Sequence, residues 1–126
     1  MTKNKLVKTS LLWDTVKHNV VMSDKAKKTI HAWPIPIKKD LGSVLTSLQN
    51  GAVIGMPDVR KMPSISKGVS EVRIKDLTGA YRVFFVIESK LGLLVFHAFK
   101  KQSQQTPKRE IATAKERLKD LLGELA

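Results

Sequence analysis

Residues 68–111 read GVSEVRIKDLTGAYRVFFVIESKLGLLVFHAFKKQSQQTPKREI, and the spacing of their apolar side chains decides the fold. Val72 and Ile74 alternate with charged residues, which is the pattern of a strand with one buried and one polar face. The turn sequence at 76–79 leads into a β-branched and aromatic run at 81–87. Because the two runs flank a short turn, they predict an antiparallel hairpin.

A third strand and a closing helix are predicted after this hairpin. A turn near 89–92 precedes a continuous apolar run at 93–99, which is typical of a strand covered on both faces. Thr106 suits the N-cap of a helix, Pro107 its first position and Glu110 its positive first turn. Apolar side chains then recur at the spacing of an amphipathic C-terminal helix, at Ile111, Ala114, Leu118, Leu121, Leu122 and Leu125.

Two further helices are predicted before the strands. Ser23 or Asp24 can cap a short first helix, which the two prolines at 34 and 36 interrupt. A second helix is expected to begin just after Pro36, because apolar residues follow it at helical spacing. It should end at Asn50 and Gly51, where glycine can adopt the left-handed conformation that closes a helix.

Length and composition predict one domain spanning residues 1–126. Residues 51–68 are rich in glycine and proline with little periodicity, so we interpret them as a connecting loop inside that domain. The apolar run at 11–13 is too short for a secretory segment, and no run approaches the ~18 residues that span a membrane. We therefore expect a cytoplasmic protein.

The sequence gives little indication of a metal or cofactor site. The chain has no cysteine, and its histidines at 18, 31 and 97 lack the spacing of a zinc site. Phosphate-loop and dinucleotide-binding fingerprints are also missing from the sequence. We expect neither a metal nor a cofactor.

Positive charge is the strongest compositional signal. The chain carries 23 Lys and Arg against 11 Asp and Glu, a net charge of +12 and a pI near 10.1. Arg73, Arg82, Lys100 and Lys101 lie on, or at the ends of, the predicted strands, so a rigid scaffold holds them. Such a surface suits a polyanion, either nucleic acid or an acidic protein.

The sequence also resembles a known toxin family. The segments EVRIKD, YRVFFV and LLVFHAFKKQSQQTPKREI, followed by Ala114 and Arg117, are similar to the phage-derived Gp-like branch of the HigB toxins. That branch belongs to the RelE/ParE superfamily of type II toxin–antitoxin systems. The resemblance covers about residues 41–121, including DLGSVLTSLQNG at 40–51. The family's N-terminal strand would fall at 11–13, displaced by an insertion around 15–22.

The resemblance implies a compact α+β RelE-like fold, with an antiparallel sheet, two N-terminal helices packed on it and a C-terminal helix. It implies a ribosome-dependent endoribonuclease, an mRNA interferase that cuts translated messenger RNA in the ribosomal A site without a metal. It also implies an antitoxin partner, a HigA-like protein with a helix-turn-helix that binds DNA.

The cationic residues fit this chemistry. Attack of a ribose 2′-hydroxyl on the adjacent phosphate needs a base, a donor to the leaving oxygen and cations around the developing charge. Arg73 and Arg82 can hold the phosphate, while Lys100 or Lys101 transfers a proton or binds backbone phosphate. His97 is either the general base or a hydrogen-bonded core residue, since it lies within the apolar run LLVFHAF.

A different class of function fits the same charges. A non-catalytic binding module would use the basic face to hold nucleic acid or an acidic protein. Superfamily relatives of the ParE type inhibit DNA gyrase and cleave no RNA, so the fold alone does not decide between these activities.

Overall fold

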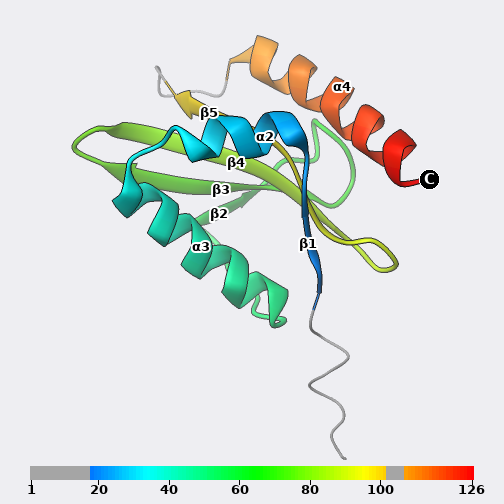
Figure 1. The fold of residues 1–126 in the computed structure, drawn as a ribbon, viewed down its shortest axis with the longest axis horizontal. Helices are drawn as coiled ribbons and strands as arrows, with labels where there is room; N and C mark the ends of the chain where they lie inside the picture. The colour runs from blue at the N-terminus through cyan, green and yellow to red at the C-terminus, as the bar shows by residue number, and fades with distance from the viewer. Residues whose placement is uncertain (1–17, 102–106) are drawn as a thin grey trace, which may run out of the picture.

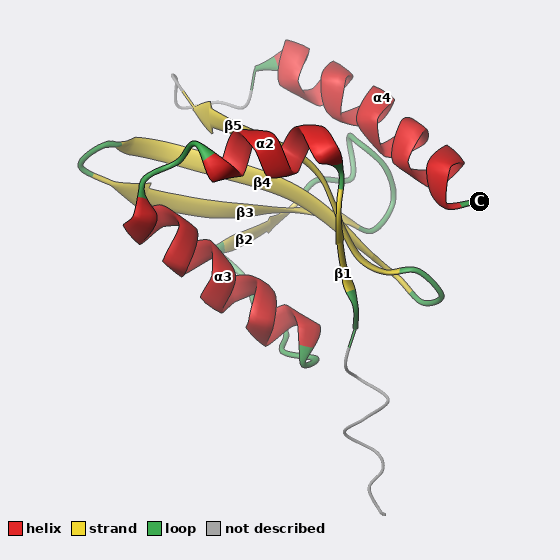
Figure 2. Ribbon diagram, viewed as in Figure 1, coloured by secondary structure: helices red, strands yellow, loops and turns green. Residues whose placement is uncertain are grey.

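The computed structural model describes residues 18–101 and 107–126. In this part of the chain one five-stranded sheet, with the strand order β1-β5-β4-β3-β2, is accompanied by three helices (Figure 1). The elements are β1 (Val20–Met22), α2 (Asp24–His31), α3 (Ile35–Gln49), β2 (Val59–Lys61), β3 (Val69–Asp76), β4 (Gly79–Glu88), β5 (Gly92–Lys101) and α4 (Lys108–Leu125). The α+β prediction is confirmed, and Figure 2 shows the sheet and helices by type.

The sheet is mixed, which corrects the prediction of an antiparallel sheet. Strand β1 pairs with β5 in parallel, while the other neighbouring strands are antiparallel. Strand β1 lies where the sequence had indicated an insertion, and residues 11–13, interpreted as the family's strand, fall outside the described residues. Two adjacent valines give β1 its strand propensity, and Ser23 directly after it caps the next helix.

The hairpin of β3 and β4 is confirmed. Asp76 pairs with Gly79, and the Asp76 carboxylate accepts a hydrogen bond of 2.8 Å from the backbone N–H of Thr78, which fixes the turn. Gly79 has a φ of 144°, which other residues rarely adopt. This turn sets the register in which Arg73 lies directly opposite Arg82.

Strand β2 was missed because it lies in the segment interpreted as a loop. It has three residues with one buried side chain, Val59, too few for a period-two pattern to be visible. It pairs antiparallel with the first half of β3, where Arg60 lies opposite Glu71. The strand therefore adds a cationic residue beside the predicted cationic strands.

The three predicted helices are present among the described residues, but their ends differ from the prediction. Ser23 caps α2 by accepting a 3.2 Å hydrogen bond from the N–H of Ala26. Helix α3 begins at Ile35, earlier than predicted, because proline is tolerated in a first helical turn. Gly51, with a φ of 91°, follows its end as expected. Helix α4 has Pro107 as its N-cap, and the predicted cap Thr106 lies outside the described residues.

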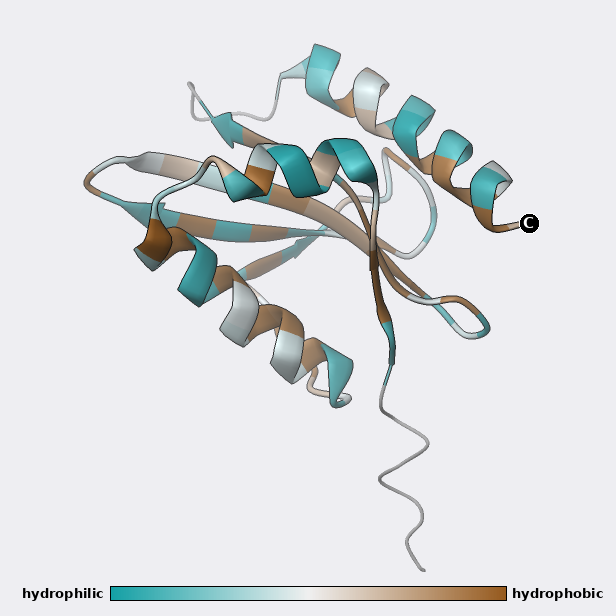
Figure 3. Cartoon of the chain, viewed as in Figure 1, coloured by the Kyte–Doolittle hydropathy of each residue, from teal (hydrophilic) through white to brown (hydrophobic). Residues whose placement is uncertain are grey.

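Two hydrophobic clusters cover opposite faces of the sheet. One joins buried residues of α2 and α3 to β3, β4 and β5 side chains such as Val72, Tyr81 and Val83. The other joins α4 to the alternate side chains, such as Val69, Phe84 and Phe99. Figure 3 shows the hydrophobic stripes on the helices and strands. None of the described helices is long and apolar enough to cross a membrane.

Candidate functional site

Charged side chains gather on the sheet face that α4 covers only in part. Arg73 lies opposite Arg82, and Arg60 lies opposite Glu71. Side chains two residues apart on a strand share a face, so Glu71 and Arg73 point the same way. Phe99 lies opposite Arg82, and Lys101 is two residues further along β5, so Lys101 points to this face as well. We call this group the cation cluster; its members are Arg60, Glu71, Arg73, Arg82 and Lys101.

Glu71 lies at the base of the cation cluster. Its side chain is fully buried, and its Oε1 is 3.6 Å from Nε of Arg82 and 3.8 Å from Nε of Arg73. The Arg82 side chain is 6% exposed and that of Arg73 is 26% exposed. A buried carboxylate between two guanidiniums offsets their mutual repulsion, and here it attracts both arginines at Nε.

Much of the donor capacity of the two arginines is unused within the described residues. Arg73 Nη1 contacts the thioether sulfur of Met56 at 3.6 Å, a weak acceptor, and Arg82 Nη1 donates to the backbone oxygen of Tyr81 at 3.2 Å. Neither buried Nε forms a hydrogen bond with another residue in this part of the chain. Each guanidinium carries five N–H groups, so both retain donors for an oxygen anion.

The surroundings of Lys101 alter its acid–base behaviour. Burial lowers the pKa of the Lys101 ammonium, the Arg82 charge lowers it further, and the Glu71 carboxylate acts in the opposite direction. Burial also lowers the pKa of Arg82, opposed by Glu71, although an arginine stays protonated near neutral pH. Lys101 is thus easier to deprotonate than an exposed lysine.

The cation cluster opens to solvent through two adjoining pockets. One, of about 290 Å³, is lined by Pro57, Asp58, Arg73, Lys75 and Arg82. The second, of about 330 Å³, shares Asp58, Arg73 and Lys75 with it and extends to helix α3. An anion can therefore reach the otherwise buried Arg82 from outside.

The two consecutive lysines at the end of β5 point to opposite faces. Lys101 belongs to the cation cluster, whereas the Lys100 ammonium lies 5.7 Å from the centre of the Tyr81 ring, on the face packed by α2 and α3. Strand alternation separates them, so of this pair only Lys101 joins Arg73 and Arg82.

His97 lies under helix α4 and is bound on both ring nitrogens. Its Nε2 is 2.7 Å from a carboxylate oxygen of Glu110, and its Nδ1 is 2.9 Å from Nη1 of Arg117. Because arginine only donates, this geometry suits a neutral ring that accepts at Nδ1 and donates from Nε2. Burial lowers the pKa of His97, and the Arg117 charge lowers it too, whereas Glu110 raises it. We call His97, Glu110 and Arg117 the histidine cluster.

Some members of the site had no clear sequence signal. Arg60 was missed with its short strand, and Asp58 lines the pockets without any recognisable motif. The alternation of EVRIKD does place Glu71, Arg73 and Lys75 on one face, and that signal was available. Arg117 was visible only as part of the family motif.

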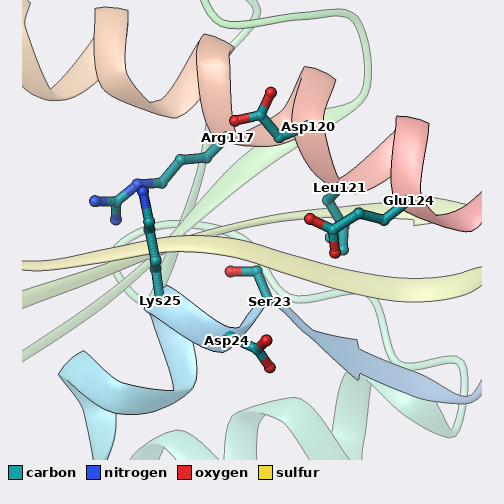
Figure 4. Close-up of a pocket in the computed structure, with 7 residues that line it drawn as sticks. All are labelled: Ser23, Asp24, Lys25, Arg117, Asp120, Leu121 and Glu124. Atoms are coloured by element: carbon teal, nitrogen blue, oxygen red, sulfur yellow. The ribbon is translucent and has the colours of Figure 1, made fainter.

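A separate pocket of about 180 Å³ lies between the start of α2 and helix α4 (Figure 4). Its lining shares no residue with the cation cluster and consists of Ser23, Asp24, Lys25, Arg117, Asp120, Leu121 and Glu124. Three carboxylates accompany two cations there, so the pocket lacks a dominant charge for an anion. It is a weaker candidate for binding a polyanion than the cation cluster.

Comparison with known proteins gives the family. Residues 28–119 match the family described as Phage derived protein Gp49-like (DUF891), a match that contains the whole cation cluster and the histidine cluster. A search of curated proteins found no match. The matched family is part of the RelE/ParE-like toxin superfamily, whose toxins generally pair with an antitoxin. On the strength of a match over most of its length, this chain belongs to the phage-derived Gp49-like family of the RelE/ParE-like toxin superfamily.

Proposed function

We propose that this protein is the toxin of a type II toxin–antitoxin system, of HigB type, and acts as a ribosome-dependent endoribonuclease. The observation that carries the proposal is the cation cluster: two arginines with unused donors that line an open pocket, and a lysine whose pKa is lowered by burial and by the Arg82 charge. These are the groups that phosphodiester cleavage by an internal hydroxyl requires.

Arg73 and Arg82 bind the scissile phosphate. Their strands place them side by side, and a guanidinium can donate two parallel hydrogen bonds to phosphate oxygens. Glu71 fixes both from below, so the arginines need little reorganisation when negative charge develops on the phosphate. Their fixed geometry stabilises the transition state more than the ground state.

Lys101 serves the proton transfers. In its neutral form its amine accepts the proton of the 2′-hydroxyl while the O2′–P bond forms and the P–O5′ bond breaks. The leaving O5′ takes a proton from a nearby donor or water, which leaves a 2′,3′-cyclic phosphate and a 5′-hydroxyl. The lowered pKa of Lys101 increases the neutral fraction available for this step.

The proposed partners follow from the family and the charge. A net charge of +12 favours association with the polyanionic ribosome and messenger RNA, so the proposed site of action is the cytoplasm. A HigA-like antitoxin with a helix-turn-helix would neutralise the toxin.

The test uses purified protein with ribosomes stalled on a defined messenger RNA, and primer extension to map new ends. We expect cleavage within the A-site codon, none on the same RNA without ribosomes, and none when the attacking nucleotide is 2′-deoxy. Cleavage of the 2′-deoxy substrate would contradict the mechanism. If no cleavage occurs but DNA gyrase is inhibited or RNA is only bound, the protein is a ParE-type toxin or a binding module.

A further inference from the structure

The groove beside the cation cluster continues past the scissile-phosphate position. Its two pockets share Asp58, Arg73 and Lys75, and the second pocket is bounded by Asp40 and Ser43 of helix α3. A ligand whose phosphate lies at Arg73 and Arg82 therefore has an adjoining space of about 330 Å³.

This space exists because β2 is short. Strand β2 pairs with β3 only as far as Val72, and the last bond across to β3 joins the Arg73 N–H to the Asp58 oxygen at 2.8 Å. Beyond it, the edge of β3 faces α3 without a strand partner in the described part of the chain. Since backbone groups of alternate residues point to the same side, the Lys75 N–H and C=O point into this open edge.

The groove offers a mixed set of hydrogen-bonding groups. Asp40 and Ser43 lie one turn apart on α3, so they share a face, and Asp58 lies across from them. All three are exposed. Two carboxylates and a hydroxyl accept hydrogen bonds from amino groups, and the Lys75 backbone adds one donor and one acceptor.

We propose that the groove between α3 and the free edge of β3 is a nucleobase subsite for the nucleotide next to the phosphate at Arg73 and Arg82. This inference rests on the proposed function, and it adds a base preference. Adenine, cytosine and guanine carry an exocyclic amino group that an aspartate can accept from, whereas uracil has none. Single-stranded RNA exposes these edges, so the subsite favours amino-bearing bases over uracil.

Binding of short RNAs tests this without requiring cleavage. The probes are fluorescent pentanucleotides that differ only at the central base, with 2′-deoxyribose throughout the centre to block reaction. We expect wild-type protein to bind central adenine or cytosine about 3- to 10-fold more tightly than central uracil, as one or two hydrogen bonds allow. Asp40→Ala and Ser43→Ala should bring that ratio close to one, because an alanine side chain accepts no hydrogen bond.

Two control variants test whether the base preference changes merely because a charge is lost or an exposed side chain is replaced. Asp120→Ala on α4 removes the same charge and side chain as Asp40→Ala does, and Ser47 lies one turn along α3 from Ser43, so Ser47→Ala matches Ser43→Ala. Both control residues are exposed and outside the groove. Both controls should keep the wild-type ratio. RNA binding without base preference, or an equal ratio in Asp40→Ala and Asp120→Ala, overturns the subsite alone. A wild-type protein that binds none of the pentanucleotides also overturns the subsite, whereas the proposed function fails only if the ribosome assay above shows no cleavage.

Discussion

The cation cluster and the histidine cluster lie on the same face of the sheet, yet they differ in how their polar groups are used. In the histidine cluster, both ring nitrogens of His97 have partners on α4, at 2.7 and 2.9 Å. In the cation cluster, neither the Nε of Arg73 nor that of Arg82 forms a hydrogen bond with another described residue, and both side chains line an open pocket. A polar network whose groups are all hydrogen-bonded holds a helix on a sheet, whereas arginine donors that lack a partner at an open pocket are suited to binding a ligand.

Replacing Arg82 should have the largest effect on activity. We expect Arg82→Ala to lower the single-turnover cleavage rate by about 100- to 1,000-fold, as removal of one preorganised donor does elsewhere. Arg82→Lys keeps the charge beside buried Glu71 and should fold, but it loses the paired donors and should remain well below wild type. Circular dichroism of both variants separates lost chemistry from lost fold. A fully active Arg82→Lys would mean that charge alone suffices.

The two lysines at the end of β5 sharpen the comparison, because they are neighbours on opposite faces. Lys101→Ala should slow cleavage by about 100-fold or more, the usual size of general acid–base effects. Lys100→Ala should stay within about 2-fold of wild type, as surface changes usually do, because it lies over Tyr81 away from the cluster. If Lys100→Ala instead slows cleavage more than Lys101→Ala does, the catalytic site lies on the opposite face of the sheet.

His97 should matter for stability and little for catalysis. We expect His97→Gln to lower the free energy of unfolding by about 1–3 kcal/mol, because the partly buried contacts of His97 with Glu110 and Arg117 are disturbed. Urea titration measures this loss, and the cleavage rate per folded molecule should stay near wild type. A large rate loss at full folding would make His97 a catalytic residue.

The smallest effect is a pH dependence of stability. Burial lowers the pKa of His97 in the folded protein, so the unfolded chain binds its proton more readily. The stability contributed by neutral His97 is therefore complete above the unfolded pKa of about 6.5 and falls as pH drops below it. Urea titrations at pH 7.5 and 5.5 should show a smaller loss of stability in His97→Gln than in wild type. An equal loss would contradict this linkage.

The regular parts of the fold could be predicted because each side chain pattern repeats. Strand β3 and helix α4 follow apolar periods, and β4 and β5 contain long continuous apolar runs, so each pattern extends over many residues. Strand β2 and the parallel strand β1 have three residues each, and such short strands depend on pairing with distant partners. No local pattern specifies that pairing.

The residues of the candidate site could be picked out from the sequence, but their positions relative to one another could not. Arg73 faces Arg82 because of the register of β3 and β4, which the sequence alone left open, since a shift of one residue would turn one arginine to the other face. Lys100 and Lys101 point to opposite faces because side chains alternate along a strand, but this follows only once β5 is known to extend to Lys101. The partners of His97 lie on a helix that follows β5, so the sequence alone left its catalytic and structural interpretations open.

One measurement tests the central claim most directly: mapping messenger RNA 5′ ends across the transcriptome after induction of wild type, Arg82→Ala and His97→Gln at equal levels of folded protein. We predict new ends at translated codons for wild type and His97→Gln, and none for Arg82→Ala. New ends that persist in Arg82→Ala, or that disappear in His97→Gln, would contradict the assignment of chemistry to the cation cluster. Growth arrest by wild type without any new ends would contradict the nuclease itself.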